Sequence, residues 1–266
     1  MSAPVVNVVI GAGSGMGAAV AARLAGRGPL LLADLRVDAL GPLASHLGPH
    51  VTTAGCDVSD QSSVEALAAL VPSLGALVIT VGLSPTMARG RRIYEVNLLG
   101  TTRVLLAFDS AVGAGSAAVL FASTAGHMMP AVEAIDATLD DAMADDFFAR
   151  LSATGVDIEV PEIAYSISKR GVLRIPPRLA ASWGARGARI VSVSPGIIDT
   201  PMGKTELAHQ PLMAPMIEAT PLARQGLADE VAAVAAFLCS ADASFVSGCD
   251  VLVDGGYIGA TAAASA

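Results

Sequence analysis

Short apolar runs alternate with longer stretches of helical spacing along most of this chain. The runs predict strands at residues 5–10, 30–33, 51–55, 76–80, 117–122, 188–193 and 251–253. Helical spacing between them predicts helices at 18–25, 37–47, 62–71, 94–108 and from about 163 onward. Because the strands are apolar throughout, both faces of their sheet are expected to be covered. The pattern predicts one α/β domain over residues 1–266, a doubly wound parallel sheet of about seven strands with helices on both faces.

Two segments depart from this regular pattern. Pro176 and Pro177 fall inside the predicted helix from about 163, where proline removes a donor and clashes with the preceding turn. We therefore expect a kink or break there. The tail at 259–266 consists of small residues with nothing to bury, and we expect it to be unstructured.

Composition excludes several classes of protein. Hydrophobic residues make up 53% and charged residues 15%, which allows a sizeable core. The net charge of −8 and the scattered arginines argue against a nucleic-acid partner. Uncharged runs at 66–88 and 110–132 are broken by proline and glycine, so they predict buried strands and turns rather than membrane spans.

Cysteine and histidine usage bears on location and metal binding. Three cysteines without a CxxC motif, and no recognisable signal peptide, favour a reducing, cytoplasmic location. The four histidines lack metal-ligand spacing, so no metal site is expected.

Glycines follow the first strand directly, in the run Gly11-Ala12-Gly13-Ser14-Gly15-Met16-Gly17. Such a loop lets backbone approach a pyrophosphate at a helix N-terminus, although it also suits a plain tight turn. Asp34 closes the second strand, where a carboxylate can accept hydrogen bonds from the adenosine ribose; it could equally be a solvated turn residue. A carboxylate repels the 2′-phosphate of NADP, so NAD is the better prediction, while Arg36 keeps NADP open.

Tyr165 and Lys169 stand four residues apart, on one face of a predicted helix. An ammonium beside a phenol lowers its pKa and makes it a general acid or base. The chain uses only two lysines, Lys169 and Lys204, against fourteen arginines, so a lysine here indicates that the amine itself is needed. The alternative is an ordinary pair on a helix surface.

Taken in order, these motifs resemble the short-chain dehydrogenase/reductase family over essentially the whole chain. Beyond the glycine loop and the Tyr165–Lys169 pair, the resemblance rests on the following positions: Asp57-Val58, Gly82, Asn97, Ser123-Thr124-Ala125-Gly126 and Pro195-Gly196-Ile197-Ile198-Asp199-Thr200. It implies a Rossmann fold that binds a nicotinamide cofactor.

The resemblance also implies a role for each catalytic residue. Tyr165 would exchange a proton with the substrate oxygen while hydride passes between nicotinamide C4 and the substrate carbon, and Ser123 would hydrogen-bond that oxygen. Lys169 would bind the nicotinamide ribose and lower the pKa of Tyr165, and Asn97 would hold a water that links Lys169 to solvent. Asn97 could instead be a buried residue bonded to backbone, and Ser123 a strand-end turn residue.

Cofactor contacts carried over from the resemblance are assigned to these residues: Gly11, Gly13, Ser14, Gly15, Met16, Gly17, Asp34, Leu35, Asp57, Val58, Val81, Gly82, Tyr165, Lys169, Pro195, Gly196, Ile198 and Thr200.

Some positions depart from the family pattern. Ile10 and Thr80-Val81 replace residues that usually brace the loops, so those hydrogen bonds must be made otherwise. The spacing from Gly82 to Asn97 is short and that from Ser123 to Tyr165 is long. This combination is similar to the bacterial 3α-hydroxysteroid dehydrogenase/carbonyl reductase branch of the family.

The long spacing corresponds to an insertion at 127–161. Apolar residues recur there at near-helical spacing with aspartates between them, at Ile135, Leu139, Met143, Phe147 and Leu151. They predict one amphipathic helix with a solvated acidic face, which would shape the substrate entrance or alter a dimer surface. His127, at its start, could face the substrate pocket or be an inert surface residue.

The segment 201–221, which we call the lid, carries Met202, Met213 and Met216. Flexible thioethers suit a mobile apolar lid over a lipophilic substrate, but they could also fill the core.

The function predicted from these features is an NAD-dependent oxidoreductase of secondary alcohols and ketones, acting on a hydroxysteroid or another hydrophobic carbonyl. Two alternatives stay open: a non-catalytic nicotinamide-binding sensor or scaffold, and an NADPH-dependent 3-oxoacyl-thioester reductase. The run at 251–256 resembles the family's interface strand, which implies a homodimer or homotetramer.

Overall fold

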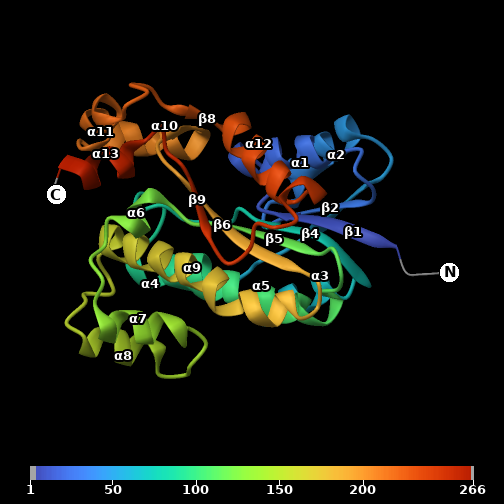
Figure 1. Ribbon diagram of the computed structural model, residues 1–266, viewed down its shortest axis with the longest axis horizontal. Coiled ribbons are helices and arrows are strands. Elements are labelled where there is room, and N and C mark those ends of the chain that lie inside the picture. Colours follow the sequence, from blue (N-terminus) through green and yellow to red (C-terminus); the bar gives the residue numbers. More distant parts are fainter. Residues whose placement is uncertain (1–3, 265–266) are drawn as a thin grey trace.

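A computed structural model describes residues 4–264 of the protein, and its centre is a parallel sheet (Figure 1). Seven strands lie in the order β3-β2-β1-β4-β5-β6-β9. Their bounds are β1 Val5–Ile10, β2 Leu30–Asp34, β3 Val51–Gly55, β4 Ser73–Ile79, β5 Ala117–Phe121, β6 Arg189–Pro195 and β9 Asp250–Val253. The predicted doubly wound α/β fold is confirmed.

Strand order reverses between β1 and β4, which are paired in parallel. The connections leaving these two strands therefore run to opposite sides, and a crevice opens outside their carboxyl ends. All the residues predicted to bind the cofactor pyrophosphate follow β1, so they lie at this crevice.

Helices cover both faces of the sheet (Figure 1). One layer consists of α1 Gly15–Leu24, α2 Leu40–Leu47 and α12 Ala228–Leu238. The other consists of α3 Gln61–Ala68, α4 Gly90–Tyr94, a π-helical segment Glu95–Gly100, α5 Thr101–Phe108 and α9 Pro161–Gly184. Short 3₁₀ turns at Val37–Ala39, Asp109–Ala111 and Ala241–Ala243 join them.

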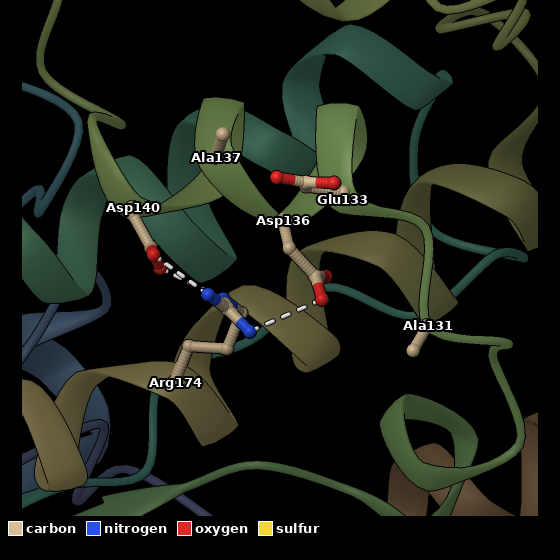
Figure 2. Close-up of a pocket in the computed structure, with 6 residues that line it drawn as sticks. All are labelled: Ala131, Glu133, Asp136, Ala137, Asp140 and Arg174. Carbon is tan, nitrogen blue, oxygen red and sulfur yellow. Dashed lines mark hydrogen bonds and ion pairs between the residues drawn. The ribbon is translucent and has the colours of Figure 1, made fainter.

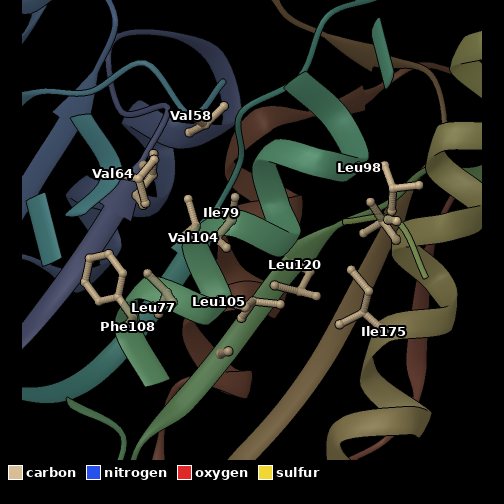
Figure 3. Close-up of a cluster of buried hydrophobic side chains, with 14 of the residues drawn as sticks. Val58, Val64, Leu77, Ile79, Leu98, Val104, Leu105, Phe108, Leu120 and Ile175 are labelled. Atoms are coloured by element: carbon tan, nitrogen blue, oxygen red, sulfur yellow. The ribbon is translucent and has the colours of Figure 1, made fainter. Parts of the chain in front are cut away.

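The apolar strands contribute side chains to two separate cores, because successive side chains of a strand point to opposite faces of the sheet. In β1, Val9 packs with the α1, α2 and α12 layer, while Val8 and Ile10 pack with the other. Figure 3 shows the second of these cores, where Leu77 and Leu120 from the sheet meet Phe108 of α5. No helix of the described residues is both long and apolar enough to cross a bilayer.

The remaining elements gather beyond the carboxyl ends of β6 and β9 (Figure 1). They are α10 Pro201–His209 and α11 Met213–Ala219 of the lid, the two-stranded pair β7 Ile198–Asp199 and β8 Gly226–Leu227, and the C-terminal helix α13 Tyr257–Ala264. The short helix α6, Thr124–His127, follows β5.

Of the two outcomes expected at Pro176 and Pro177, a kink or a break, the break does not occur. α9 runs without interruption through both prolines. Ile175 and Pro176 are buried, and Ile175 belongs to the core that contains β5 and β6 residues. Packing of this face against the sheet therefore holds the helix together despite two missing amide donors.

The unstructured tail is also wrong as far as residue 264, because α13 covers Tyr257–Ala264. Alanine has the highest helix propensity, so an alanine-rich segment needs little burial to form a helix. The Asp254 carboxylate accepts hydrogen bonds from the amides of Gly256 and Ile258 and so holds the first turn. Residues 265–266 lie outside the described residues.

The insertion forms two helices instead of the single one predicted, α7 Glu133–Asp140 and α8 Phe147–Ala153. Aspartate is a poor helix former, and α7 ends at Asp140, before the further aspartates Asp141, Asp145 and Asp146. The apolar pattern is confirmed for Leu139, Phe147 and Leu151, which are buried in the main core, while Ile135 is partly buried and Met143 is exposed.

The acidic face of the insertion is not simply solvated, which corrects a second expectation. Arg170 of α9 binds both oxygens of Asp136 at 2.6 Å, and Arg174 binds both oxygens of Asp140 at 2.7 and 2.6 Å. Figure 2 shows Arg174 between the two carboxylates, beside a groove of about 490 Å³ that α7 and α9 line. The ion pairs fasten the insertion to the helix that carries Tyr165.

Candidate active site

The glycine loop turns tightly from β1 into α1. A Cβ at Gly17 would lie 2.0 Å from the carbonyl oxygen of Gly11, so no side chain fits there. Gly11 has φ +90°, and its own Cβ would meet the Thr80 hydroxyl at 2.6 Å. The Thr80 hydroxyl donates to the carbonyls of Ile10 and Gly11 at 3.0 and 3.1 Å. Thr80 is thus the substitute brace that the sequence required.

Asp34 lies directly under this loop. Its Oδ2 accepts a hydrogen bond from the Gly13 amide at 2.8 Å, and its Oδ1 accepts one from the Arg36 amide at 2.9 Å. The Arg36 guanidinium reaches the Ser14 hydroxyl at 3.3 Å. A carboxylate and a guanidinium therefore border the loop on the same side, where the adenosine ribose is expected.

Three of the residues predicted to contact the cofactor, Leu35, Asp57 and Val58, follow β2 and β3. Asp57 accepts hydrogen bonds from the amide and hydroxyl of Ser59, and Arg92 lies 3.6 Å away. Burial works to raise the pKa of Asp57, but these donors outweigh it and the pKa is lowered. Val58 is buried and Leu35 is exposed, which leaves an apolar side chain at the rim.

Gly82 and Asn97 meet behind the crevice. A Cβ on Gly82 would lie 3.3 Å from Lys169 Nζ and 3.5 Å from Asn97 Oδ1. Asn97 accepts from the Leu83 amide at 2.7 Å and donates to the Leu83 carbonyl at 3.0 Å. It stands in the π-helical segment, a distortion frequent at functional sites, and it fixes the loop after β4 by both backbone groups. Val81, beside Gly11, packs against the main core.

The structure brings together the four residues predicted to be catalytic. Lys169 is buried and donates to the carbonyl of Phe121, the last residue of β5, at 2.7 Å, while its Nζ lies 5.9 Å from the Tyr165 ring centroid. Ser123, two residues beyond Phe121, caps α6 and is within hydrogen-bonding reach of Tyr165. Asn97 completes the group through its contact with the neighbouring Ser168 hydroxyl at 3.3 Å.

The acid–base properties differ from the sequence expectation in one respect. Burial raises the pKa of Tyr165, Ser123 counteracts this by hydrogen bonding, and the negative charge of Glu206 adds to the increase. Burial lowers the pKa of Lys169 to about 8. The expected lowering of the Tyr165 pKa is therefore wrong, since desolvation of the phenolate is the largest effect and it raises the pKa.

The far wall of the crevice comes from the segment after β6. A Cβ on Gly15 would contact the Thr200 side chain at 3.5 Å, so the glycine loop and this segment face each other. Thr200 caps α10 through the Gly203 amide at 3.0 Å, and Ile198 is buried. Pro195 ends β6, and Gly196 packs closely on Asp254. Met16, next to Gly15, is half-buried against the α1 side of the sheet.

The polar groups that border the crevice match those that a nicotinamide dinucleotide needs. The tight glycine turn exposes backbone amides at the start of α1, Asp34 offers carboxylate oxygens at the ribose position, and Lys169 with Tyr165 lies across the crevice. Such a donor and acceptor set fits a dinucleotide that spans the switch point of the sheet.

Sequence reasoning missed Glu206 entirely. It is the buried residue of α10, and it bonds to Ser84 and Thr86 on the loop after β4. No motif marks it, because a single glutamate among exposed lid residues has no spacing signal.

His127 does not stand free on the surface. Its Nε2 lies 2.9 Å from an Asp250 oxygen and 3.2 Å from the Ser194 hydroxyl. Since Asp250 and Ser194 both face the same ring nitrogen, the three cannot form a nucleophilic triad, which needs both nitrogens. The group braces α6, and with it Ser123, against the sheet edge.

Comparison with known proteins agrees with this geometry. Residues 5–135 match the family described as short chain dehydrogenase, and residues 150–258 match the one described as enoyl-(acyl carrier protein) reductase. The short-chain dehydrogenase/reductase bsc3 of Alternaria brassicicola is 34% identical over 94% of both chains, and D-threitol dehydrogenase of Mycolicibacterium smegmatis is 32% identical over 95% of this chain and 92% of its own.

A solved structure shares the architecture as well. The short-chain dehydrogenase/reductase of Brucella melitensis described as a glucose/ribitol dehydrogenase is 27% identical, with a TM-score of 0.76 over 95% of this chain and 96% of its own. Fold, site geometry and full-length relatives agree, and this chain belongs to the short-chain dehydrogenase/reductase family.

Proposed function

We propose that this oxidoreductase of CH–OH donors uses NAD to interconvert a secondary alcohol and its ketone. The observation that carries the proposal is the assembly of Tyr165, Ser123 and Lys169 at one end of a crevice that the glycine loop and Asp34 border at the other. This arrangement is typical of a site that exchanges a proton with a substrate hydroxyl beside a groove for a dinucleotide.

The chain's own residues divide the proton chemistry. With its pKa raised, the Tyr165 phenol is protonated at neutral pH and can donate to a carbonyl oxygen, with the Ser123 hydroxyl as a second donor. The buried Lys169 ammonium, 5.9 Å from the Tyr165 ring, would stabilise the phenolate needed for the reverse direction. The cofactor, when bound, supplies or accepts the hydride. Asn97 would keep the loop after β4 in place beside Lys169 through both backbone groups of Leu83.

Asp34 supports NAD over NADP. Both of its oxygens lie beside the glycine loop, where a 2′-phosphate would meet like charge. Arg36 bonds to Ser14 and would offer the opposite charge, so the balance between these two side chains decides the preference. We expect kcat/KM with NAD to exceed that with NADP at least tenfold. The Asp34→Ala variant should have a smaller ratio of kcat/KM with NAD to kcat/KM with NADP. A wild type that prefers NADP would contradict this assignment.

The substrate is proposed as a neutral secondary alcohol or ketone. Among relatives, two galactitol or threitol dehydrogenases and a 3β-hydroxysteroid dehydrogenase align over most of their length at 30–32% identity. The sequence predicted a hydroxysteroid or another hydrophobic carbonyl as substrate, and hydroxysteroids are therefore included in the substrate panel described below. Met202, Met213 and Met216 are half-buried and belong to neither core, which is compatible with an apolar lid surface.

The Tyr165→Phe variant tests the proposal directly. Loss of the general acid is expected to lower kcat by about 10²–10⁴ in both directions, followed as NADH absorbance with a panel of sugar alcohols, cyclic alcohols and hydroxysteroids. Tyr257→Phe, on α13, is the matched control and is expected to match the wild type. Cofactor binding without turnover, with Tyr165→Phe indistinguishable from wild type, would favour a nicotinamide sensor instead.

A further inference from the structure

Glu206 is an unusual side chain for a lid helix. It is 9% exposed, and it is the buried residue of α10, whose other described side chains are half-buried or exposed. Carboxylates are rarely buried unless they are paired, because desolvation of the charge is costly. Its burial therefore needs an explanation beyond packing.

The partners of Glu206 do not neutralise it. Its Oε1 accepts hydrogen bonds from the Ser84 hydroxyl at 2.7 Å, from the Thr86 amide at 3.3 Å and from the Thr86 hydroxyl. All three donors are uncharged, and among residues 4–264 no lysine or arginine forms an ion pair with it. Its second oxygen, Oε2, accepts no hydrogen bond from the described residues.

The position of this carboxylate is close to the chemistry. Ser84 and Thr86 belong to the loop that follows Gly82, which borders Lys169 Nζ and Asn97. The charge of Glu206 acts on the Tyr165 phenol. A substrate whose carbinol reaches Tyr165 and Ser123 must have the rest of its structure near α10, the helix that Thr200 caps beside the glycine loop.

We propose that Glu206 is a specificity-determining residue: Oε2 accepts a hydrogen bond from a second hydroxyl of a neutral substrate, and its charge excludes substrates that carry an anionic group. The inference rests on the proposed function. A site built to bond a substrate hydroxyl discriminates strongly against analogues that lack it, because the buried acceptor is then left unpaired. Repulsion of a second carboxylate at close range adds the exclusion of anions.

Three ring compounds of one size test the proposal: cyclohexanol, cyclohexanediol with the second hydroxyl at carbon 3 or 4, and hydroxycyclohexanecarboxylate with the carboxylate at the same carbons. The full-length wild type is expected to oxidise a diol at least about tenfold better than cyclohexanol in kcat/KM, and the carboxylate at least tenfold worse. This contrasts with a relative, 32% identical, described as cis-4-hydroxycyclohexanecarboxylate dehydrogenase. A wild type without this ranking overturns the proposal.

Glu206→Gln removes the charge while its amide oxygen can still accept from Ser84 and Thr86. We expect the carboxylate-to-cyclohexanol ratio of kcat/KM to rise at least about tenfold and the diol-to-cyclohexanol ratio to fall. Glu218→Gln, an exposed glutamate of α11, is the matched control and should keep the wild-type ratios. If Glu206→Gln lowers all three rates by one common factor, Glu206 only holds the lid and the proposal is wrong.

Calorimetric dissociation constants of the same compounds, measured with NAD-saturated Tyr165→Phe so that turnover does not contribute heat, and oxidation rates of the wild type together separate the two levels of inference. If the diol binds more tightly than cyclohexanol and the carboxylate more weakly, but none is oxidised, the proposed function is refuted and the role of Glu206 in specificity is supported. If the compounds are oxidised but differ in neither affinity nor rate, the proposed function is supported and the role of Glu206 is refuted.

Discussion

Lys169 is buried and its ammonium has one protein acceptor, the Phe121 carbonyl. Burial lowers its pKa from an ordinary 10.5 to about 8, so near neutral pH it is charged but close to titration. At the residue scale this makes Lys169 a group whose charge responds to mild alkali, and the ammonium stabilises the Tyr165 phenolate only below that range.

We expect direct titration to give a pKa of about 8 for Lys169. The chain has only two lysines, so a sample labelled with ¹³C at lysine Cε gives two signals by NMR, and Lys204→Arg assigns the remaining one. Because the folded pKa is below the unfolded one, the folded protein binds fewer protons between them. The stability contribution is therefore present above pH 10.5 and is lost as the pH falls through about 8. A midpoint above 10 would contradict this.

A residue of the site was predictable where it belongs to a sequence motif with fixed spacing between its members. Tyr165, Lys169, Ser123 and the glycine loop each belong to a motif, and the structure places them at one crevice. The direction of the Tyr165 pKa was not predictable, because desolvation depends on what covers the phenol. Glu206 was not predictable either, since its partners lie 122 and 120 residues away in the sequence.

At the scale of elements, side-chain ion pairs decide where the insertion lies. Asp136 is 13% exposed and Arg170 16% exposed, so this bidentate pair is shielded from solvent. Hydrogen bonding to Arg170 lowers the pKa of Asp136, against the opposing effect of burial. The aspartates of the insertion therefore attach α7 to α9. In the amphipathic helix that the sequence predicts for the insertion, these aspartates lie in solvent.

Asp136→Asn is expected to lower the free energy of unfolding by about 2 kcal/mol at pH 7, because it leaves Arg170 and Arg174 with a neutral partner. Urea denaturation measures the difference. Asp145→Asn, on the exposed link between α7 and α8, is the control and should be nearly neutral. Since the folded pKa is lowered, the difference between wild type and Asp136→Asn should begin to decrease near the ordinary value of 3.8 and be lost as the pH falls through the lower folded pKa.

The mispredicted elements have two kinds of physical cause. Burial of Ile175, which keeps α9 continuous, and capture of Asp136 by Arg170 are tertiary effects that local sequence does not contain. The end of α7 before further aspartates and the alanine-rich helix α13 instead follow from local helix propensity. Strand positions were predictable because a fully covered parallel strand must be apolar throughout, whatever it contacts.

At the scale of the whole molecule, the insertion belongs to the main core. Leu139, Phe147 and Leu151 share one cluster of buried residues with β4 and β5 side chains, and Tyr94 of α4 meets Phe147 and Phe148 edge-on. Deletion of the insertion would expose this cluster, so point substitutions are the better probe.

Leu151→Ala is expected to destabilise the entire protein by about 2–5 kcal/mol, because the side chain is fully buried. Trp183, the single tryptophan, lies in α9, and its fluorescence should change at the same denaturant concentration as the far-UV circular dichroism. Met143→Ala, at an exposed position of the link, should shift neither transition. Separate transitions for the two signals would mean that the insertion unfolds by itself.

The two lysines differ completely in their access to solvent. The Lys204 side chain on α10 is 72% exposed, whereas Lys169 is buried. Of these two amines, an N-hydroxysuccinimide fluorophore would therefore label the one on the lid and spare the one at the catalytic tyrosine. Among the lysines, the native composition thus provides one attachment point for a fluorophore on the segment 201–221, once the α-amine of the chain, which reacts with the same reagent, is blocked.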